Sequence, residues 1–141
     1  EGMAGARALV ALLAAALLLA QAVLGSEERG RLLGAPEDVA ENNKGLQQAL
    51  QFAMAQYNRA SNDKYSSRVV RVISAKRQLV SGLKYTIEVE IGRTTCTKAE
   101  ADPQSCALHD TPEMAKYTTC NFVVYTIPWL NQIKLLKSSC E

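Results

Sequence analysis

The chain has 141 residues and carries 16 basic and 14 acidic side chains, for a formal net charge of +2. So small an excess of positive charge gives no reason to expect nucleic acid binding. The sequence has no phosphate-binding loop, H-E-x-x-H motif or EF-hand loop, and its one histidine, His109, is interpreted as a surface residue in a loop. The sequence therefore favours a protein that is not an enzyme, and it predicts neither a cofactor nor a metal site.

Residues 1–25 have the pattern of a secretory signal peptide. Arg7 is the only cationic side chain before a short apolar run, and small residues follow that run. The run is short for a membrane span, and signal cleavage fits after Ala22 or after Gly25. Cleavage after Gly25 leaves one domain, residues 26–141, which we expect to be secreted, extracellular and not bound to a membrane.

The polar segment that comes next, residues 26–40, has neither a helical nor a strand period. It contains the apolar sequence Leu32-Leu33-Gly34-Ala35. The two leucines either fold back onto the domain or remain available to a partner, and composition alone leaves both interpretations open.

Residues 43–59 predict an amphipathic helix, with Asn42 or Asn43 as its N-cap. The apolar residues at helical spacing are Leu46, Leu50, Ala53, Met54 and Tyr57. We expect this stripe to lie in the core, because the chain has no other long helix to fill it. The helix should end at the turn formed by Ser61, Asn62 and Asp63.

Four stretches predict β-strands, because β-branched and aromatic residues dominate them or because apolar and polar residues alternate. They are residues 65–80, 83–91, 116–127 and 130–137. The first stretch is long, and the phase of its apolar residues shifts, which predicts a bulge or strong curvature. One helix followed by antiparallel strands predicts an α+β fold in which the helix packs across one face of the sheet.

The turn between the first two strands, Gln78-Leu79-Val80-Ser81-Gly82, is apolar near its apex. Gly82 can supply the positive φ that a tight turn needs. Leu79 and Val80 either continue the strand into the core or project toward a partner's cleft, and the hairpin by itself does not decide between the two.

Pro128 and Trp129 mark the turn between the last two strands, because proline cannot donate to a strand ladder. Trp129 is either a lid on the core or an interface anchor. Alternate turns of an antiparallel sheet lie at the same end, so this turn and residues 78–82 are placed to lie side by side. If residues 32–35 lead into an edge strand, the three apolar segments form one rim.

The four cysteines, Cys96, Cys106, Cys120 and Cys140, all lie in the C-terminal third of the chain. An even number of cysteines in a small secreted chain implies disulfides. Three pairings are possible, and pairing of nearest neighbours closes two short loops without threading. A zinc site is the competing interpretation, which the lack of a C-x₂-C pair and the oxidising compartment disfavour.

Taken in this order, these motifs resemble those of the type 2 cystatins, secreted inhibitors of papain-like cysteine proteases such as the cathepsins. The resemblance covers residues 26–141 and rests on Gly34, the Q-x-V-x-G sequence of residues 78–82, the Pro-Trp turn and the four cysteines. It implies a curved five-stranded antiparallel sheet around one long helix, with an early strand before the helix. It also implies that Cys96 pairs with Cys106 and Cys120 with Cys140.

The resemblance further implies reversible, tight-binding inhibition by occlusion of the active-site cleft. Residues 32–35, the turn at residues 78–82 and the Pro128-Trp129 turn would form a wedge that fills the cleft. Leu32 and Leu33 would occupy subsites on one side of the catalytic cysteine, and Trp129 would pack on the other side.

A second inhibitory surface follows from the same resemblance. The turn Ser61-Asn62-Asp63 resembles the turn by which some type 2 cystatins inhibit legumain, an asparagine-specific protease, whose specificity pocket Asn62 would enter. The alternative is an ordinary helix-ending turn, which these residue types favour anyway.

We expect a monomer, and the alternative is a domain-swapped dimer with the turn at residues 78–82 as its hinge. The alternative function is that of a cystatin-fold antimicrobial or other non-inhibitory secreted binding module. Such relatives generally lack an intact Q-x-V-x-G loop and Pro-Trp turn, and this chain has both.

Overall fold

The computed structural model describes residues 34–141, which contain one long helix and five strands. Their bounds are β1 Glu37–Asp38, α2 Lys44–Ala60, β2 Tyr65–Leu79, β3 Leu83–Thr97, β4 Tyr117–Ile127 and β5 Gln132–Cys140, with short 3₁₀ helices η1 Pro103–Ser105 and η2 Pro128–Leu130. All of these elements belong to the unit Pro36–Glu141. The predicted signal peptide lies outside the described residues. Within the described part of the chain, no helix is long and apolar enough to cross a membrane.

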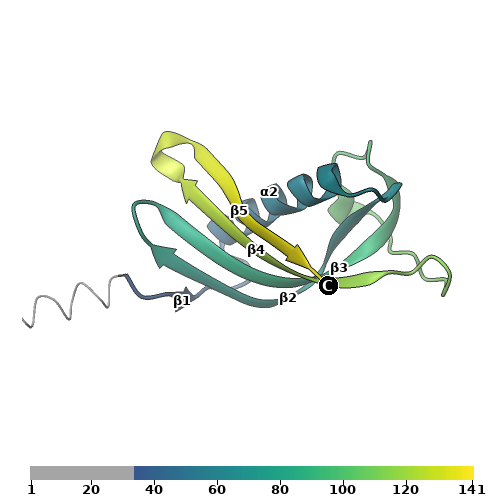
Figure 1. The fold of residues 1–141 in the computed structure, drawn as a ribbon, viewed down its shortest axis with the longest axis horizontal. Helices are drawn as coiled ribbons and strands as arrows, with labels where there is room; N and C mark the ends of the chain where they lie inside the picture. The colour runs from purple at the N-terminus through teal and green to yellow at the C-terminus, as the bar shows by residue number, and fades with distance from the viewer. Residues whose placement is uncertain (1–33) are drawn as a thin grey trace, which may run out of the picture. The chain divides into compact units, whose positions relative to one another are not determined.

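The five strands form one antiparallel sheet in the order β1-β2-β3-β4-β5. Figure 1 shows that the sheet curves and that α2 lies across one of its faces. Strands that follow one another in the chain are therefore neighbours throughout the sheet. The α+β prediction of one long helix packed on a five-stranded antiparallel sheet is confirmed.

Helix α2 begins where its sequence provides a cap. The Asn43 side chain accepts a hydrogen bond from the Leu46 amide at 3.0 Å, and the Asn43 backbone is extended (φ −62°, ψ 129°), as an N-cap requires. The buried residues of the helix are Leu46, Ala49, Leu50, Ala53, Met54 and Asn58. The apolar stripe lies in the core, so it is not a free partner-binding face.

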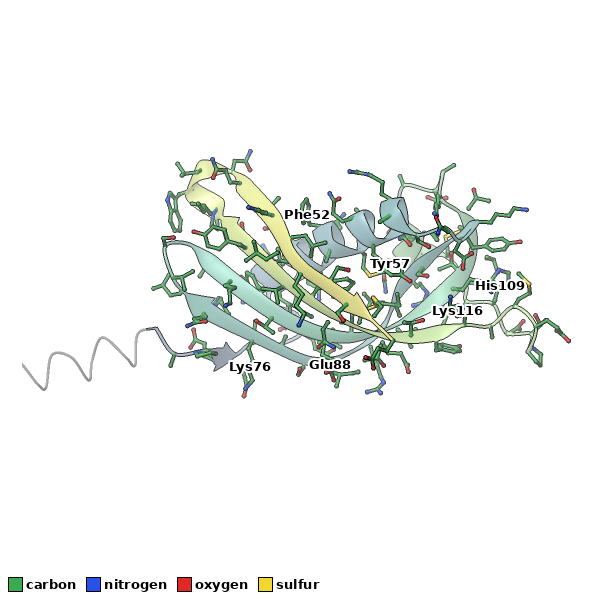
Figure 2. All side chains as sticks on the ribbon, in the orientation of Figure 1. Phe52, Tyr57, Lys76, Glu88, His109 and Lys116 are labelled. Carbon is green, nitrogen blue, oxygen red and sulfur yellow. A yellow bond between two sulfur atoms is a disulfide. The ribbon has the colours of Figure 1, made fainter. Side chains whose placement is uncertain are left out.

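The sheet contributes the other half of the core through alternate residues. The buried core residues are Ala75 of β2, Tyr85, Ile87, Val89 and Ile91 of β3, and Cys120, Phe122 and Val124 of β4. The Tyr57 ring on α2 meets the Phe122 ring edge-on, with centroids 6.5 Å apart, and Figure 2 shows Phe52 and Tyr57 on the helix. Lys76 and Glu88 project from the face turned away from α2 (Figure 2). The predicted alternation of β3 therefore separates a buried face from a solvated one.

Strand β2 carries the predicted irregularity. Its pairing with β3 shifts register at three places, between Tyr65 and Ser67, between Val69 and Arg71, and between Val72 and Ser74. Bulges add twist and bend a strand, so they allow the long β2–β3 ribbon to curve around α2.

Two strands extend beyond their predicted ends. Strand β3 runs to Thr97 because its later residues still pair with the start of β2, where Ser67 lies opposite Arg93 and Tyr65 opposite Thr97. Strand β5 runs to Cys140 because that residue lies directly opposite Cys120. Both extensions depend on pairing with residues far away in the chain, so they could not be predicted from the local residue pattern.

Both disulfides join cysteines that are neighbours in the sequence. Cys96 bonds to Cys106 and Cys120 bonds to Cys140, and no described cysteine is free. The first disulfide ties the end of β3 to the segment that contains η1, and the second links β4 to β5. The pairing implied by the resemblance is present, and the zinc interpretation of the four cysteines is excluded.

Candidate functional site

The β2–β3 and β4–β5 turns lie side by side at one end of the sheet (Figure 1). Leu83, just after the first turn, pairs with Thr126, just before the second. The approach is so close that a Cβ atom built on Gly82 would lie 2.6 Å from the Thr126 carbonyl oxygen and 3.0 Å from Ile127 Cγ1. We call residues 79–82 and 128–131 together the loop edge.

Gly82 is required for a different reason from the one predicted. Asn131 is the one non-glycine residue with a positive φ among the described residues, and no described glycine has one. The expectation of a positive φ at Gly82 is therefore wrong. A side chain at position 82 would clash with the backbone of Thr126. Gly82 therefore allows the two turns to pack closely together, and it is not needed for an unusual backbone conformation of its own turn.

The apolar side chains of the loop edge face solvent. Leu79 is 52% exposed and Val80 is 47% exposed, although the Val80 amide donates to the Gly82 carbonyl at 2.9 Å and fixes the turn. Trp129 is 65% exposed and Leu130 is 57% exposed. Of the two interpretations of these residues, projection from the domain holds and core packing does not. A cluster of exposed apolar side chains of this kind is typical of an interaction surface.

The second turn is held by residues that sequence reasoning missed. Asn131 ends η2 in the left-handed conformation (φ 54°, ψ 40°), and its amide donates to the Pro128 carbonyl at 3.1 Å. The Thr126 hydroxyl donates to the Gln132 carbonyl at 3.0 Å. Asparagine tolerates this conformation better than most residues, so Asn131 between Leu130 and a strand was a usable signal.

Tyr125 connects the two turns. Its hydroxyl lies 2.7 Å from the Ser81 hydroxyl, within hydrogen-bond distance. This contact cannot be predicted from the sequence, because Tyr125 lies within β4 next to buried Val124, and that position indicates only an outward side chain. Residues 81 and 125 thus make the loop edge a single body.

The third predicted segment is described only in part. Gly34 lies in a turn and Ala35 in a bend, while Leu32 and Leu33 lie outside the described residues. The unit Pro36–Glu141 begins with β1, in which Glu37 pairs with Arg77, two residues before Leu79. The expected early strand before the helix is present as this short edge strand.

In the turn after α2, hydrogen bonds fix the residues on both sides of one exposed residue, Asn62. The Asp63 amide donates to the Ser61 hydroxyl at 3.1 Å, and the Tyr65 amide donates to Asp63 Oδ1 at 3.0 Å. The Arg93 guanidinium lies 2.7 Å from Asp63 Oδ2. Asn62, between Ser61 and Asp63, is exposed. This turn precedes β2 and the loop edge follows it, so the two predicted sites lie at opposite ends of that strand.

The environment of Asp63, including its ion pair with Arg93, changes the pKa of its carboxyl group. Burial by itself would raise the pKa of the carboxyl group. The hydrogen bonds from the Tyr65 amide and the Arg93 side chain, together with the positive charges of Arg93 and Lys116, outweigh burial and lower the pKa below its ordinary value. Asp63 therefore holds the turn best when it is ionised.

His109 is less exposed than predicted. Its ring meets the Tyr65 ring edge-on at 4.6 Å between centroids, and its amide donates to the Arg93 carbonyl at 3.0 Å. Its Nε2 atom is buried and has no hydrogen-bond partner within the described structure. His109 therefore lies in a loop, as predicted, but its side chain is half-buried rather than fully exposed.

Comparison with known proteins agrees with this architecture. The Cystatin domain family matches residues 34–129. The chain is 77% identical over 139 residues to Cystatin of Gallus gallus, covering 99% of this chain and 100% of that protein, and 47% identical over 137 residues to Cystatin-C of Oryctolagus cuniculus, covering 92% and 93%. The structure of dimeric human cystatin F is similar with a TM-score of 0.71 at 31% identity, covering 77% of this chain and 86% of that one. The chain therefore belongs to the cystatin family, within which it is close to the avian cystatins.

Proposed function

We propose that the chain is a secreted, reversible, tight-binding inhibitor of papain-like cysteine proteases of the cathepsin kind, and that it is not an enzyme. The observation that carries this proposal is the loop edge. Leu79, Val80 and Trp129 project from two turns that Gly82 and Tyr125 hold against each other. Such an edge has the form of a wedge that enters a cleft and occludes it.

Preorganisation is the physical reason for tight binding. A partner that binds a mobile loop must restrict its side chains and backbone, which costs free energy, whereas these turns are already fixed by the hydrogen bonds of Val80, Ser81 and Asn131. Burial of the exposed apolar side chains then contributes to affinity. The protease nucleophile meets side chains and closed turns, with no suitably placed carbonyl group to attack.

The N-terminal segment completes the proposed wedge. We infer that residues 1–25 are removed as a signal peptide and that the inhibitory domain spans residues 26–141. Leu32 and Leu33 occupy subsites of the protease on one side of its catalytic cysteine, and Gly34 and Ala35 carry the backbone past that cysteine. The position of β1 supports this, because Glu37 enters the sheet beside Arg77, close to the first turn.

The test is a titration of active papain with oxidised, refolded residues 26–141, followed with a small fluorogenic substrate. Stoichiometric and reversible loss of activity is expected from a monomer, and size-exclusion chromatography separates any domain-swapped dimer beforehand. Full protease activity in the presence of folded monomer would contradict the proposal. Leakage of anionic liposomes at low salt would then favour the antimicrobial or other non-inhibitory alternative.

A second function, inhibition of legumain, is proposed for the Ser61-Asn62-Asp63 turn. Its support is that Asn62 is exposed while hydrogen bonds fix the residues on both sides of it. Asn62→Ala should abolish legumain inhibition and leave papain inhibition intact. Asn121→Ala, at another exposed asparagine, on β4, is the matched control. Legumain inhibition retained by Asn62→Ala would refute this site.

A further inference from the structure

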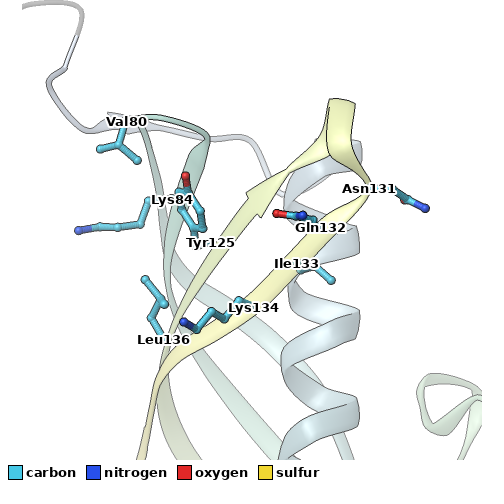
Figure 3. A pocket seen from close by; sticks show the side chains of 8 residues that line it. All are labelled: Val80, Lys84, Tyr125, Asn131, Gln132, Ile133, Lys134 and Leu136. Atoms are coloured by element: carbon cyan, nitrogen blue, oxygen red, sulfur yellow. The ribbon is translucent and has the colours of Figure 1, made fainter.

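A groove of about 800 Å³ opens on the sheet beside the first turn (Figure 3). Val80, Lys84, Tyr125, Lys134 and Leu136 are among the residues that line it. In Figure 3 these five side chains lie on the same side of the strands, the side turned away from α2. The groove therefore belongs to the outer face of the sheet and not to the core.

The middle of the groove is a row of three directly paired residues. Lys84 on β3 lies opposite Tyr125 on β4, and Tyr125 lies opposite Lys134 on β5. Residues that face each other across antiparallel strands have neighbouring side chains, so one lysine side chain starts on each side of Tyr125. We call these three residues the lysine row.

Among the described residues, the lysine row has no charge partner. Neither Lys84 nor Lys134 forms an ion pair with another described residue, and no acidic residue lines the groove. Both lysines are thus available to a negatively charged partner. The apolar side chains of Val80 and Leu136 border the same groove, so a partner surface here meets both charge and apolar area.

The groove and the loop edge are joined to each other. Val80 belongs to both, and the hydrogen bond between Ser81 and Tyr125 fixes the first turn to the centre of the lysine row. A protease whose cleft accepts the loop edge consequently brings the rim of that cleft over the groove.

We propose that the lysine row receives carboxylate groups on the cleft rim of the target protease, so that the inhibitor favours proteases with an acidic rim. This inference rests on the proposed function, since it assigns a further contact to the same complex. Charged groups at the rim of an interface act chiefly on the association rate and on its dependence on salt. The row therefore selects among papain-like proteases by how fast it captures them.

The test compares two double variants of equal net charge. Lys84→Gln with Lys134→Gln removes the row, and Lys64→Gln with Lys116→Gln removes two lysines that precede β2 and β4, at the opposite end of the sheet from the loop edge. Association rates are measured at several salt concentrations. The probes are one papain-like protease with acidic residues on its cleft rim and the same protease with those residues changed to their amides. Thermal unfolding checks that each variant is folded.

We expect loss of the row to slow association with the acidic protease by about three- to tenfold at low salt, and the control by less than about twofold. The difference should disappear near 0.5 M salt and against the amide protease, since screening or removal of the charges ends the attraction. Equal rates for the two double variants would overturn the inference and leave the proposed function standing. Failure of the unmodified inhibitor to inhibit the acidic protease would overturn both.

Discussion

The hydroxyl groups of Ser81 and Tyr125 lie 2.7 Å apart although the residues are 44 positions apart in the chain. This contact joins the turn of one hairpin to a strand of the next. The proposed wedge thus depends on a bond between its first turn and the strand that leads into its second turn, as well as on the residues at the tips of both turns.

Removing either hydroxyl should loosen the first turn. Tyr125→Phe and Ser81→Ala each delete one partner of a hydrogen bond that contributes about 1 kcal/mol, so the inhibition constant for papain should rise by roughly three- to tenfold. Because both lose the same bond, the double variant should be no worse than either single one. Ser81→Thr keeps a hydroxyl and should retain most of the affinity. Tyr117→Phe, at the start of β4, is the control, and additive effects of the two changes would count against a shared bond.

Gly82→Ala should force the two turns apart. Its new Cβ atom would meet the Thr126 carbonyl, which is backbone and cannot rotate away, so we expect a loss of about 1–3 kcal/mol in folding stability and weaker inhibition by the folded fraction. Gly92→Ala is the matched control, since its Cβ atom would meet side-chain atoms of Leu108 and Val70 at 2.8 and 3.1 Å. That variant should lose stability but inhibit normally once folded. If Gly82→Ala inhibits as well as Gly92→Ala, the close approach does not matter for binding.

The helix, the strand alternation and the two turns could be predicted from the sequence, because each of them depends on a local periodicity of apolar residues or on residue types that favour turns. The sequence could not show why Gly82 is a glycine. A turn that needs a positive φ and a position that the backbone approaches closely both require glycine, so the sequence looks the same in the two cases. Only the structure, in which Leu83 pairs with Thr126 and Gly82 has no positive φ, distinguishes them. Long-range pairing also extended β3 past its predicted end.

Tyr125 shows the same limit within the candidate site. Tyr125 looks like any outward residue of β4, and its role exists only because Ser81 comes to lie beside it. The sequence located the apolar residues of the two turns, Leu79, Val80 and Trp129. It did not show whether they face solvent or the core, because strand periodicity does not show where a sheet ends.

Trp129→Ala should weaken protease binding by more than about 1 kcal/mol, roughly fivefold or more in the inhibition constant, as anchoring aromatic residues typically do. The side chain is 65% exposed, so folding stability should hardly change. Tyr117→Ala removes another aromatic side chain, 54% exposed, from the opposite end of β4 and should leave inhibition unaltered. A binding free energy equal to that of the unmodified protein within error would argue against Trp129 as an anchor.

The N-terminal segment should contribute to affinity without contributing to the fold. Gly34→Trp, or deletion of residues 26–34, is expected to weaken papain inhibition strongly, about tenfold or more, because a bulky side chain or a missing segment leaves subsites of the cleft unfilled. Thermal unfolding should be unchanged, since both changes precede the unit Pro36–Glu141. Ala40→Ser, just before α2, is a control for a mild change outside the wedge. Unchanged inhibition in both variants would remove this segment from the mechanism.

Protonation of Asp63 at low pH should destabilise the Ser61-Asn62-Asp63 turn. Its pKa in the folded protein is lower than the ordinary value of 3.8, so the ionised carboxylate stabilises the fold fully above that pH, and this contribution is lost as the pH falls through the folded pKa. Asp63→Asn should therefore cost about 1–2 kcal/mol of unfolding free energy between pH 5 and 7, and the difference should shrink below about pH 3.8. Asp110→Asn, in an exposed loop outside this turn, is the control for the loss of one negative charge. A difference that stays constant down to pH 2 would mean that the Arg93 ion pair is not what holds the turn, because protonation would then have removed nothing.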